Sequence, residues 1–373
     1  MAGLGFIIVA AFIALFGYLI VPDDTTDANT QLAELALRKP GFEATLLPVH
    51  LPREPERADF FSRLFNGREP AVRWIAIEPA SLILRGDSVY FHRLGVLEKE
   101  ESVHLTMLFA SVKDSIRKTQ DTYFFTNAAG DGQQLDRAQL AQTYPSKIEH
   151  RVLRLGTDKF GRDIFSRLLL GFRVSLLVGG IAVFISLTIG LFLGALGGYF
   201  RGRTDDAVML LINTVWSIPT LLLVFAIVLA LGRGIGIIFL AVGLTMWVDV
   251  ARLVRGQVLA LRDLPFVEAA RSMGFSSGRI IFRHILPNLM GPVLVVAAGN
   301  FATAVLVESG LSYLGFGVQP PAPSWGTMLN ENYGYALSGK PLAALAPAGA
   351  IALTVLAFNL VGNGLRDALD VKA

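Results

Sequence analysis

Residues 263–288 read DLPFVEAARSMGFSSGRIIFRHILPN and separate two apolar runs that are each long enough to cross a membrane. Asp263 is placed to cap a first helix, and Gly274 is the residue type that commonly follows a helix end. A second short helix is predicted over Arg279–Ile285, and Pro287 is expected to end it. The stretch therefore predicts a polar helix–glycine–helix element between two membrane spans.

The first of these helices has one face of mixed side-chain size. Four residues recur at the spacing of a single helix face, namely Phe266, Ala269, Ala270 and Met273. Small side chains allow close approach and large ones fill pockets, so the element suits docking into a groove on another protein. A helix lying on the bilayer surface has the same periodicity, and periodicity alone does not separate the two.

Glu268-Ala269-Ala270, followed by Gly274 and then by Leu286-Pro287, resembles the EAA motif of the membrane subunits of binding-protein-dependent ABC importers. His284 stands where the family pattern has isoleucine, and the run His-Ile-Leu-Pro-Asn resembles the variant of the peptide-transporter branch. The resemblance implies that residues 263–288 couple this chain to an ATP-binding subunit. The coupling residues expected on this basis are Phe266, Glu268, Ala269, Ala270, Met273, Gly274, Leu286 and Pro287.

The composition is that of a membrane protein. Of 373 residues, 53% are hydrophobic and 17% are charged, whereas soluble domains carry about 25% charged residues. The net charge of +3 is small and the arginines cluster beside apolar runs, which indicates topology signals rather than a nucleic-acid surface. The absence of cysteine excludes disulfides and thiolate ligands, and five scattered histidines disfavour a metal site.

Six apolar runs predict an all-α polytopic membrane protein with about six transmembrane helices. Residues 1–21 hold the first run, Gly3–Val21, which we interpret as an uncleaved span because no basic segment precedes it; a cleaved signal peptide is the alternative. The remaining runs, within a permease core at 174–370, are Val174–Tyr199, Ala207–Leu231, Ile235–Val250, Leu289–Leu311 and Leu342–Leu365. A ridge for close helix packing is predicted by three glycines at four-residue spacing, Gly190, Gly194 and Gly198.

Residues 22–154 are charged and broken into short elements, and they predict an α+β domain inserted between the first two spans. Strands are predicted at Ala44–Leu51, Val72–Ile77 and Ser81–Leu94, the last with a turn at residues 85–88. Asp136 is placed to cap a helix through residue 144. Charged residues here, such as Asp87 and Arg85, are interpreted as solvated surface rather than as a catalytic site.

Leu155–Arg173 carries too many glycines and charges for a membrane span, and predicts an amphipathic interfacial helix or a gate element. It resembles the GTD-x-x-GRD-x-x-SR segment of the C-type subunit of dipeptide and oligopeptide importers. The matching residues are Gly156, Thr157, Asp158, Gly161, Arg162, Asp163, Ser166 and Arg167. Further matches at 308–326 and 353–370 extend the resemblance from Leu155 to Asp370 and leave residues 22–150 outside it.

Arginine counting predicts the orientation of the chain. The 263–288 element and the connection at 201–203 are rich in arginine, whereas the loops after the third and fifth spans hold only Arg233 and Lys340. We therefore expect the 263–288 element and both termini in the cytoplasm, and the inserted domain outside the membrane.

Polar residues within the spans raise the possibility of a translocation path. The candidates are Asn213, Pro219, Glu308 and Asn359. Pro219 frees a backbone carbonyl at membrane depth, which requires a cavity or a neighbour to satisfy it. A solvated position near the interface is the alternative for Glu308, and a hydrogen bond between two helices is the alternative for Asn359.

Taken with the motifs, the resemblance implies a non-enzymatic permease subunit of an ATP-driven importer in the cell inner membrane, carrying peptides or related small solutes. The implied partners are a homologous second permease, two ATP-binding subunits, an extracytoplasmic solute-binding protein and membrane lipid. The sequence has no Gly-x-x-x-x-Gly-Lys-Ser/Thr loop, so ATP and magnesium are expected on the partner subunits and no cofactor on this chain. A nickel chelate or modified peptide as cargo, or a membrane-anchored extracytoplasmic sensor or assembly factor, are the alternatives.

Overall fold

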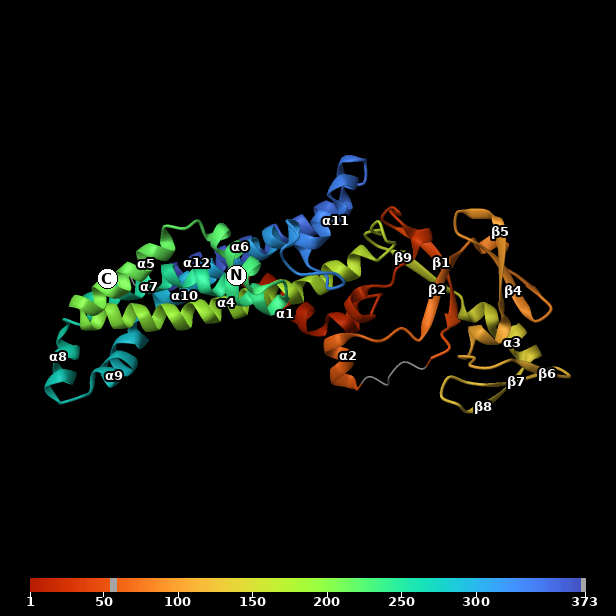
Figure 1. The fold of residues 1–373 in the computed structure, drawn as a ribbon, viewed down its shortest axis with the longest axis horizontal. Coiled ribbons are helices and arrows are strands. Elements are labelled where there is room, and N and C mark those ends of the chain that lie inside the picture. The colour runs from red at the N-terminus through yellow and green to blue at the C-terminus, as the bar shows by residue number, and fades with distance from the viewer. Residues whose placement is uncertain (54–58, 370–373) are drawn as a thin grey trace. The chain divides into compact units, whose positions relative to one another are not determined.

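The computed structural model describes residues 1–53 and 59–369, which form two compact units (Figure 1). The first, here called the membrane unit, consists of Met1–Ala14, Gly171–Asn330 and the segment from Ala344 onward. The second, the β-rich unit, consists of Leu15–Leu170 and Glu331–Ala343. Asp370, where the expected permease core ends, lies outside the described residues, as do residues 54–58 of the expected insertion.

Five helices in the described part of the chain are long and apolar enough to cross a membrane, which confirms a polytopic membrane protein. They are α1 (Ala2–Ile20), α4 (Ile164–Phe200), α7 (Ile235–Leu261), the helical run Ser277–Tyr313 that ends in α10 (Leu286–Tyr313), and α12 (Leu342–Leu369). A broken pair, α5 (Gly202–Trp216) and α6 (Thr220–Leu231), makes a sixth span if counted as one.

The α5–α6 pair bends by 88° at residues 217–219, where a single straight span is predicted from hydropathy. Pro219 has no N–H to continue the helix of α5, and it takes the N-cap position of α6. The last turn of α5 closes with bonds from the Ser217 amide to the Asn213 carbonyl (3.0 Å) and from the Ile218 amide to the Val215 carbonyl (3.2 Å). The proline therefore turns the chain rather than only freeing a carbonyl.

The predicted glycine ridge packs α4 against α7. A Cβ added to Gly194 would lie 2.6 Å from the carbonyl oxygen of Ala251, and one added to Gly198 would lie 2.8 Å from that of Arg255. A side chain at Gly190 would likewise come within 2.5 Å of Val250. Because no ordinary Cβ makes such contacts, the glycines are what allow the two backbones to approach.

Apolar side chains from four helices form the main core of the membrane unit. Val178 of α4, Val224 of α6, Val242 of α7 and Leu311 of α10 all belong to one cluster and are fully buried. Within a bilayer such side chains stabilise the bundle by close packing rather than by removal from water, because lipid tails are equally apolar. The cluster holds the bent pair onto α7 and α10.

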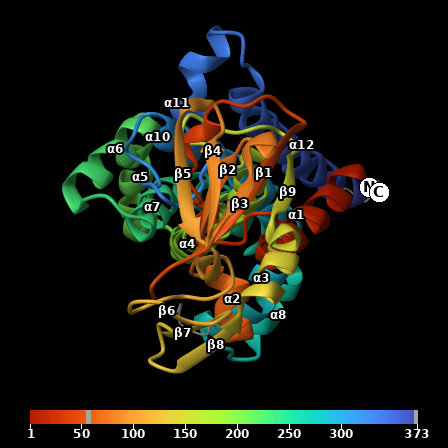
Figure 2. The same cartoon turned by 90° about the vertical axis from the view of Figure 1, so that its right-hand side faces the viewer.

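The β-rich unit is built on a six-stranded antiparallel sheet, shown with its strands side by side in Figure 2. Its strand order is β3-β4-β2-β1-β9, with β5 also pairing with β4. The strands are β1 (Phe42–His50), β2 (Val72–Ile77), β3 (Ile83–Arg85), β4 (Ser88–Arg93), β5 (Val96–His104) and β9 (Glu149–Leu153). β2 coincides with the predicted strand, and β3 and β4 form the predicted hairpin about residues 85–88.

A second sheet of three strands, β6 (Arg117–Thr119), β7 (Thr122–Thr126) and β8 (Gly132–Asp136), follows in the same unit. Helix α3 (Arg137–Thr143) begins with Asp136, whose carboxylate accepts a bond from the Gln139 amide (2.8 Å), as predicted for a cap. A further short helix, α2 (Phe60–Asn66), precedes β2.

Asp87, at the tip of the β3–β4 hairpin, is a partly exposed surface carboxylate that also anchors the hairpin. Its carboxylate accepts bonds from Lys118 (2.8 Å), from the Tyr123 hydroxyl (2.6 Å) and from Arg137 (2.9 Å). These bonds hold the pKa of Asp87 at about 2, below its ordinary value of 3.8. Arg85 pairs instead with Glu100 on β5.

Candidate functional site

The 263–288 element begins with helix α8 (Pro265–Ser272), which is amphipathic in the structure. Val267 and Ala270 are 0% and 1% exposed and pack in a cluster with Val254 of α7 and Ile285. Ala270 is therefore part of the inner face, which corrects its predicted place on the outer one. Four other expected coupling residues, Phe266, Glu268, Ala269 and Met273, are exposed.

Gly274 closes α8 with a left-handed residue at φ +77°. The amide of Phe275 bonds to the carbonyl of Ala270 (3.2 Å) and the amide of Gly274 to that of Arg271 (3.0 Å). This is the Schellman pattern that glycine supports best, because a Cβ is disfavoured at such a φ. Gly274 is exposed and nothing lies within 4 Å of the position that its Cβ would take.

Two expectations for the ends of these helices are wrong. Asp263 caps nothing: Leu264 holds the N-cap position of α8, and the Asp263 carboxylate instead accepts a bond from Arg201 (2.5 Å), which lowers its pKa. Pro287 does not end the second helix either. α9 (Ser277–Ile280) continues through a π-helical turn at Ile281–Ile285 directly into α10. A π turn has the wider spacing that accommodates a proline without an N–H just after it.

The expected contact residues Leu286 and Pro287 lie at this junction. Leu286 is half-buried against the cluster that holds Ala270, and Pro287 is exposed. The continuous helical run from α9 into α10 joins the exposed element to a membrane span without an intervening loop.

Arginine side chains fix the start of this element to the α4–α5 connection, a role that charge counting alone does not reveal. Arg255 of α7 forms a two-pronged pair with Asp205 of α5, one prong measuring 2.6 Å between Nη2 and Oδ2. Arg262 donates to the carbonyl of Tyr199. Paired guanidinium and carboxylate groups of this geometry give orientation as well as attraction.

The segment predicted as an interfacial helix or gate, Leu155–Arg173, is not a separate helix. Its first part, to Asp163, is an irregular loop, and its second part is the beginning of α4, which starts at Ile164. Charge and glycine content mark the loop correctly but do not show that α4 begins inside the segment.

Two glycines of this loop lie against the backbone of the segment at 32–38. Gly161 has φ +76°, and a Cβ there would lie 1.8 Å from the carbonyl oxygen of Leu32. Gly156 has φ +75°, and its Cβ would lie 2.3 Å from the carbonyl oxygen of Arg38. The contact is completed by a bond from the Leu32 amide to the Phe160 carbonyl (3.2 Å). Only glycine fits at these two positions.

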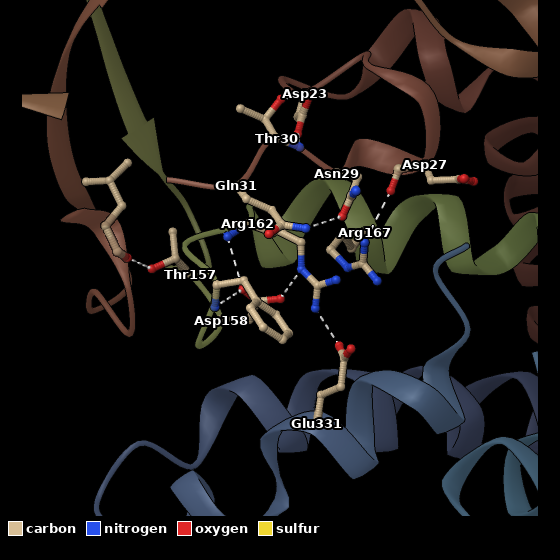
Figure 3. Close-up of polar contacts among 12 residues, drawn as sticks. Asp23, Asp27, Asn29, Thr30, Gln31, Thr157, Asp158, Arg162, Arg167 and Glu331 are labelled. Atoms are coloured by element: carbon tan, nitrogen blue, oxygen red, sulfur yellow. Dashed lines mark hydrogen bonds and ion pairs between the residues drawn. The ribbon is translucent and has the colours of Figure 1, made fainter. Parts of the chain in front are cut away.

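A buried ion triad lies at the centre of the loop (Figure 3). Arg162, 2% exposed, donates from Nε to the Asp158 carboxylate (2.6 Å) and from Nη2 to Glu331 of α11 (Trp325–Leu337; 2.5 Å). Asp158 also accepts bonds from the amides of Phe160 and Arg162 (2.9 and 3.0 Å). Thr157 extends the network by donating to the carbonyl of Leu35.

The remaining three residues of the motif tie the loop to residues 23–27. The Ser166 hydroxyl donates to Asp163 (2.5 Å) and accepts a bond from the Asp23 amide (3.1 Å). Arg167 donates to the carbonyl of Asp27 (3.3 Å), as Figure 3 shows. Burial raises the pKa of Asp163. All eight motif residues thus take part in one folded junction of the β-rich unit.

The four candidate path residues do not come together. Glu308 of α10 is 0% exposed, so the solvated alternative for it is wrong. Its carboxylate accepts bonds from the hydroxyls of Ser312 and Ser324, each 2.7 Å long. Asn213, Pro219 and Asn359 are exposed on the surface of the chain.

From the sequence, Asp249 and Arg252 indicate only the inner membrane boundary, whereas the structure has them beside the α5–α6 bend. The guanidinium carbon of Arg252 on α7 lies 3.7 Å from the ring centroid of Trp216, the last residue of α5. Asp249, one turn earlier on α7, is exposed and lines a small cavity of about 60 Å³ with Trp216 and Thr245. In the sequence these two charged residues stand at the boundary of a predicted span. Only folding brings them beside Trp216.

Within residues 1–53 and 59–369, no three His, Asp or Glu side chains converge where a metal ion could bind. The candidate sites on the described residues are the exposed helix α8, the buried ion triad at Arg162 and the charged groups beside the α5–α6 bend.

Comparison with known proteins places this geometry among transport proteins. A family described as "Binding-protein-dependent transport system inner membrane component" matches residues 186–373. The chain is similar to the oligopeptide transport system permease protein of Bacillus subtilis, 43% identical over 217 residues, which cover 58% of this chain and 71% of that protein. It is 44% identical over 218 residues to the glutathione transport system permease protein of Pectobacterium atrosepticum (58% and 72% covered). It is 41% identical over 231 residues to the dipeptide transport system permease protein of Bacillus subtilis (62% and 71% covered).

Proposed function

Because this chain belongs to the family of binding-protein-dependent transport system inner membrane components, we propose that it forms one half of the translocation path of an ATP-driven importer of short peptides. The protein is a multi-pass permease subunit and not an enzyme. Relatives named for oligopeptides, dipeptides and glutathione support a peptide cargo of a few residues.

The proposed assembly has a second, homologous permease beside this chain, two ATP-binding subunits on the cytoplasmic face and a solute-binding protein outside. ATP and magnesium are bound by the ATP-binding subunits. The proposed topology places both termini and the 263–288 element in the cytoplasm and the inserted domain at 22–154 outside. The arginine-rich composition of the 263–288 element supports this orientation.

Coupling is proposed to run through the exposed side of α8. Phe266 and Met273 are 40% and 64% exposed, although both are large and apolar, so a partner groove gains by covering them. ATP-driven movement of that groove would be carried by the continuous run from α9 into α10. ATP shifts the permease between its outward and inward openings only if it binds one state more tightly than the other.

The path is proposed to pass the α5–α6 bend. Asp249 lies 14 positions after the start of α7, about 21 Å along a helix that begins near one face of the membrane. A charged side chain at such depth costs about 2.5–3.5 kcal/mol or more against lipid, so Asp249 and Arg252 face water or protein. Together with Trp216, they offer charged and aromatic groups to the charged ends of a peptide, at a broken helix of the kind that lines solute sites.

The coupling proposal is supported by Gly274, which is exposed and has space for a side chain within this chain, so a substitution there tests contact with a partner. The tagged chain is coexpressed with its partner subunits, purified in mild detergent as wild type and as Gly274→Asp, and the copurifying chains are identified by mass spectrometry. We expect the variant to keep the second permease and lose the ATP-binding subunits.

Gly339→Asp is the matched control, since Gly339 also has a positive φ (+84°) and nothing within 4 Å of its Cβ position, but lies outside the 263–288 element. It should retain every partner. If wild type purifies alone, the importer proposal fails and a sensor role replaces it. If both variants keep all partners, the coupling assignment of Gly274 is wrong.

A further inference from the structure

We propose that α2 is a lipid-binding helix, whose Phe60 and Phe61 insert into the bilayer interface beside the end of α1. The proposal concerns how the β-rich unit meets the membrane, and it does not depend on which cargo the protein carries. It rests on the exposure of the two rings, on the depth at which α2 is attached, and on the way its charges are paired.

The rings of Phe60 and Phe61 are exposed, whereas a different residue of α2, Leu64, is buried against the protein. Phe60 and Phe61 are 57% and 66% exposed and stack edge to face, with centroids 5.7 Å apart. Leu64, one turn later, is 6% exposed and provides the contact that holds α2 to the protein. Phenylalanine rings bury about 150–250 Å² each when covered, so two adjacent exposed rings indicate a surface that is covered in use.

The attachment of α2 fixes its depth. α1 has 19 residues and is therefore about 28 Å long, close to the roughly 30 Å of hydrocarbon that it crosses. Its last helical residue, Ile20, thus lies at the hydrocarbon boundary. Gly67, which ends α2, lies against Tyr18: a Cβ on Gly67 would come within 2.8 Å of the Tyr18 ring. Tyr18 is only about 3 Å below the end of α1.

Two backbone hydrogen bonds and two ion pairs also hold α2 at this depth. The amide of Arg68 bonds to the carbonyl of Asp24 (2.9 Å), and the amide of Thr26 bonds to the carbonyl of Arg68 (3.2 Å). The Asp24 carboxylate pairs with Arg68 (2.6 Å) and with Arg63 (3.7 Å). With seven residues, α2 is about 10 Å long, whereas one interfacial layer is roughly 5–8 Å thick, so on this proposal α2 lies along the bilayer surface rather than across it.

The ion pairs of the nearby arginines also indicate how strongly the binding of α2 to a bilayer should depend on lipid charge. Arg63 and Arg68 share the single carboxylate of Asp24, and Arg151, in the wall of the neighbouring cavity of about 590 Å³, pairs with Glu149 (2.8 Å). The two carboxylates balance all but one of these guanidinium charges. Binding should therefore depend mainly on the two rings and only weakly on anionic lipid, unlike that of a basic surface helix.

The chain has no cysteine, so single spin labels can be placed without other changes. Phe61→Cys, and Phe60→Cys as a second variant, are labelled and the full chain is reconstituted with its partner subunits in phosphatidylcholine vesicles. Phe124→Cys is the matched control, because Phe124 is also an exposed phenylalanine (40%) but lies on β7 of the separate three-stranded sheet. Collision rates of each label are measured with oxygen, which concentrates in lipid, and with a water-soluble nickel chelate.

At positions 60 and 61 the ratio of oxygen to nickel collision rates should exceed unity, and at position 124 it should fall below unity. Adding phosphatidylglycerol should change the ratios only slightly. Labels at 60 and 61 that react with the nickel chelate as the control does would overturn the proposal. Labels that are shielded from both reagents would also overturn it, since a protein surface then covers α2.

Discussion

Nη2 of Arg162 and Oε2 of Glu331 lie 2.5 Å apart, although 169 positions separate the two residues in the sequence. The guanidinium is 2% exposed and the carboxylate side chain 11%. Asp158 shares the same guanidinium, so one cation is held by two carboxylates with little access to water. Removal of the Glu331 charge leaves Arg162 paired with Asp158, so what is lost is one buried, charge-assisted hydrogen bond.

Glu331→Gln should therefore destabilise the β-rich unit by about 1.5–3 kcal/mol. We expect faster hydrogen exchange in the peptides that cover residues 31–38 and 156–167, measured by mass spectrometry on the purified protein. Glu100→Gln is the control: its pair with Arg85 is exposed, with 37% and 54% of the side chains accessible, and its loss should cost roughly 0–1 kcal/mol. Equal protection in the two variants would contradict the structural role of Glu331.

Replacing Gly194 by alanine should loosen the contact between α4 and α7. The new Cβ would lie 2.6 Å from the backbone oxygen of Ala251, which cannot move aside as a flexible side chain can, and overpacking of this kind costs about 1–3 kcal/mol. Gly180→Ala, on the same helix with nothing within 4 Å, should instead stabilise the protein by roughly 0.5–1 kcal/mol. The check is the thermal unfolding midpoint of both variants in detergent, and shifts of the same sign would refute the ridge.

Several structural features that depend on residues close together in the sequence were predicted correctly. Hydropathy located the spans, β-type residues located β2, and Asp136 caps α3 as expected. The four-residue glycine spacing predicted the α4 ridge, since spacing along a helix defines which residues share a face. The polytopic helical class and the position of the 263–288 element between two spans followed from such signals.

What could not be predicted depends on partners far away in the chain or on the choice between two faces. Periodicity grouped Ala270 with Phe266, but it does not say which edge of the face turns inward, and Ala270 packs against α7. Hydropathy reports how apolar a segment is and not the direction of its axis. The two helices that meet at an 88° bend before residue 220 were therefore predicted as one straight span. Glu308 looked solvated because its hydroxyl donor Ser324 lies 16 positions later, in a loop.

Ser312→Ala should release the loop that follows α10. The Ser312 hydroxyl accepts a bond from the Val318 amide (3.0 Å) and donates to Glu308 (2.7 Å), so its loss leaves a buried donor and a buried carboxylate each with one bond fewer. Such a loss costs about 1–3 kcal/mol. Hydrogen exchange of residues 316–325 should accelerate. Ser338→Ala removes an exposed hydroxyl and should change nothing; equal exchange in both variants would contradict the network.

The stability of the β-rich unit should fall in acid because of Asp87. Its folded pKa of about 2 lies below the ordinary 3.8, so the carboxylate stabilises the fold fully above pH 3.8 and loses that contribution as the pH falls towards 2. The side chain is 33% exposed, so solvent screening limits the effect to about 1 kcal/mol. Urea unfolding, followed by the fluorescence of Trp74 on β2, should give a lower midpoint for Asp87→Asn than for wild type at pH 7, with the difference shrinking below pH 3.8 and vanishing near pH 2. A difference that stays constant over this range would show that Asp87 is not ionised in its bonds to Lys118, Tyr123 and Arg137.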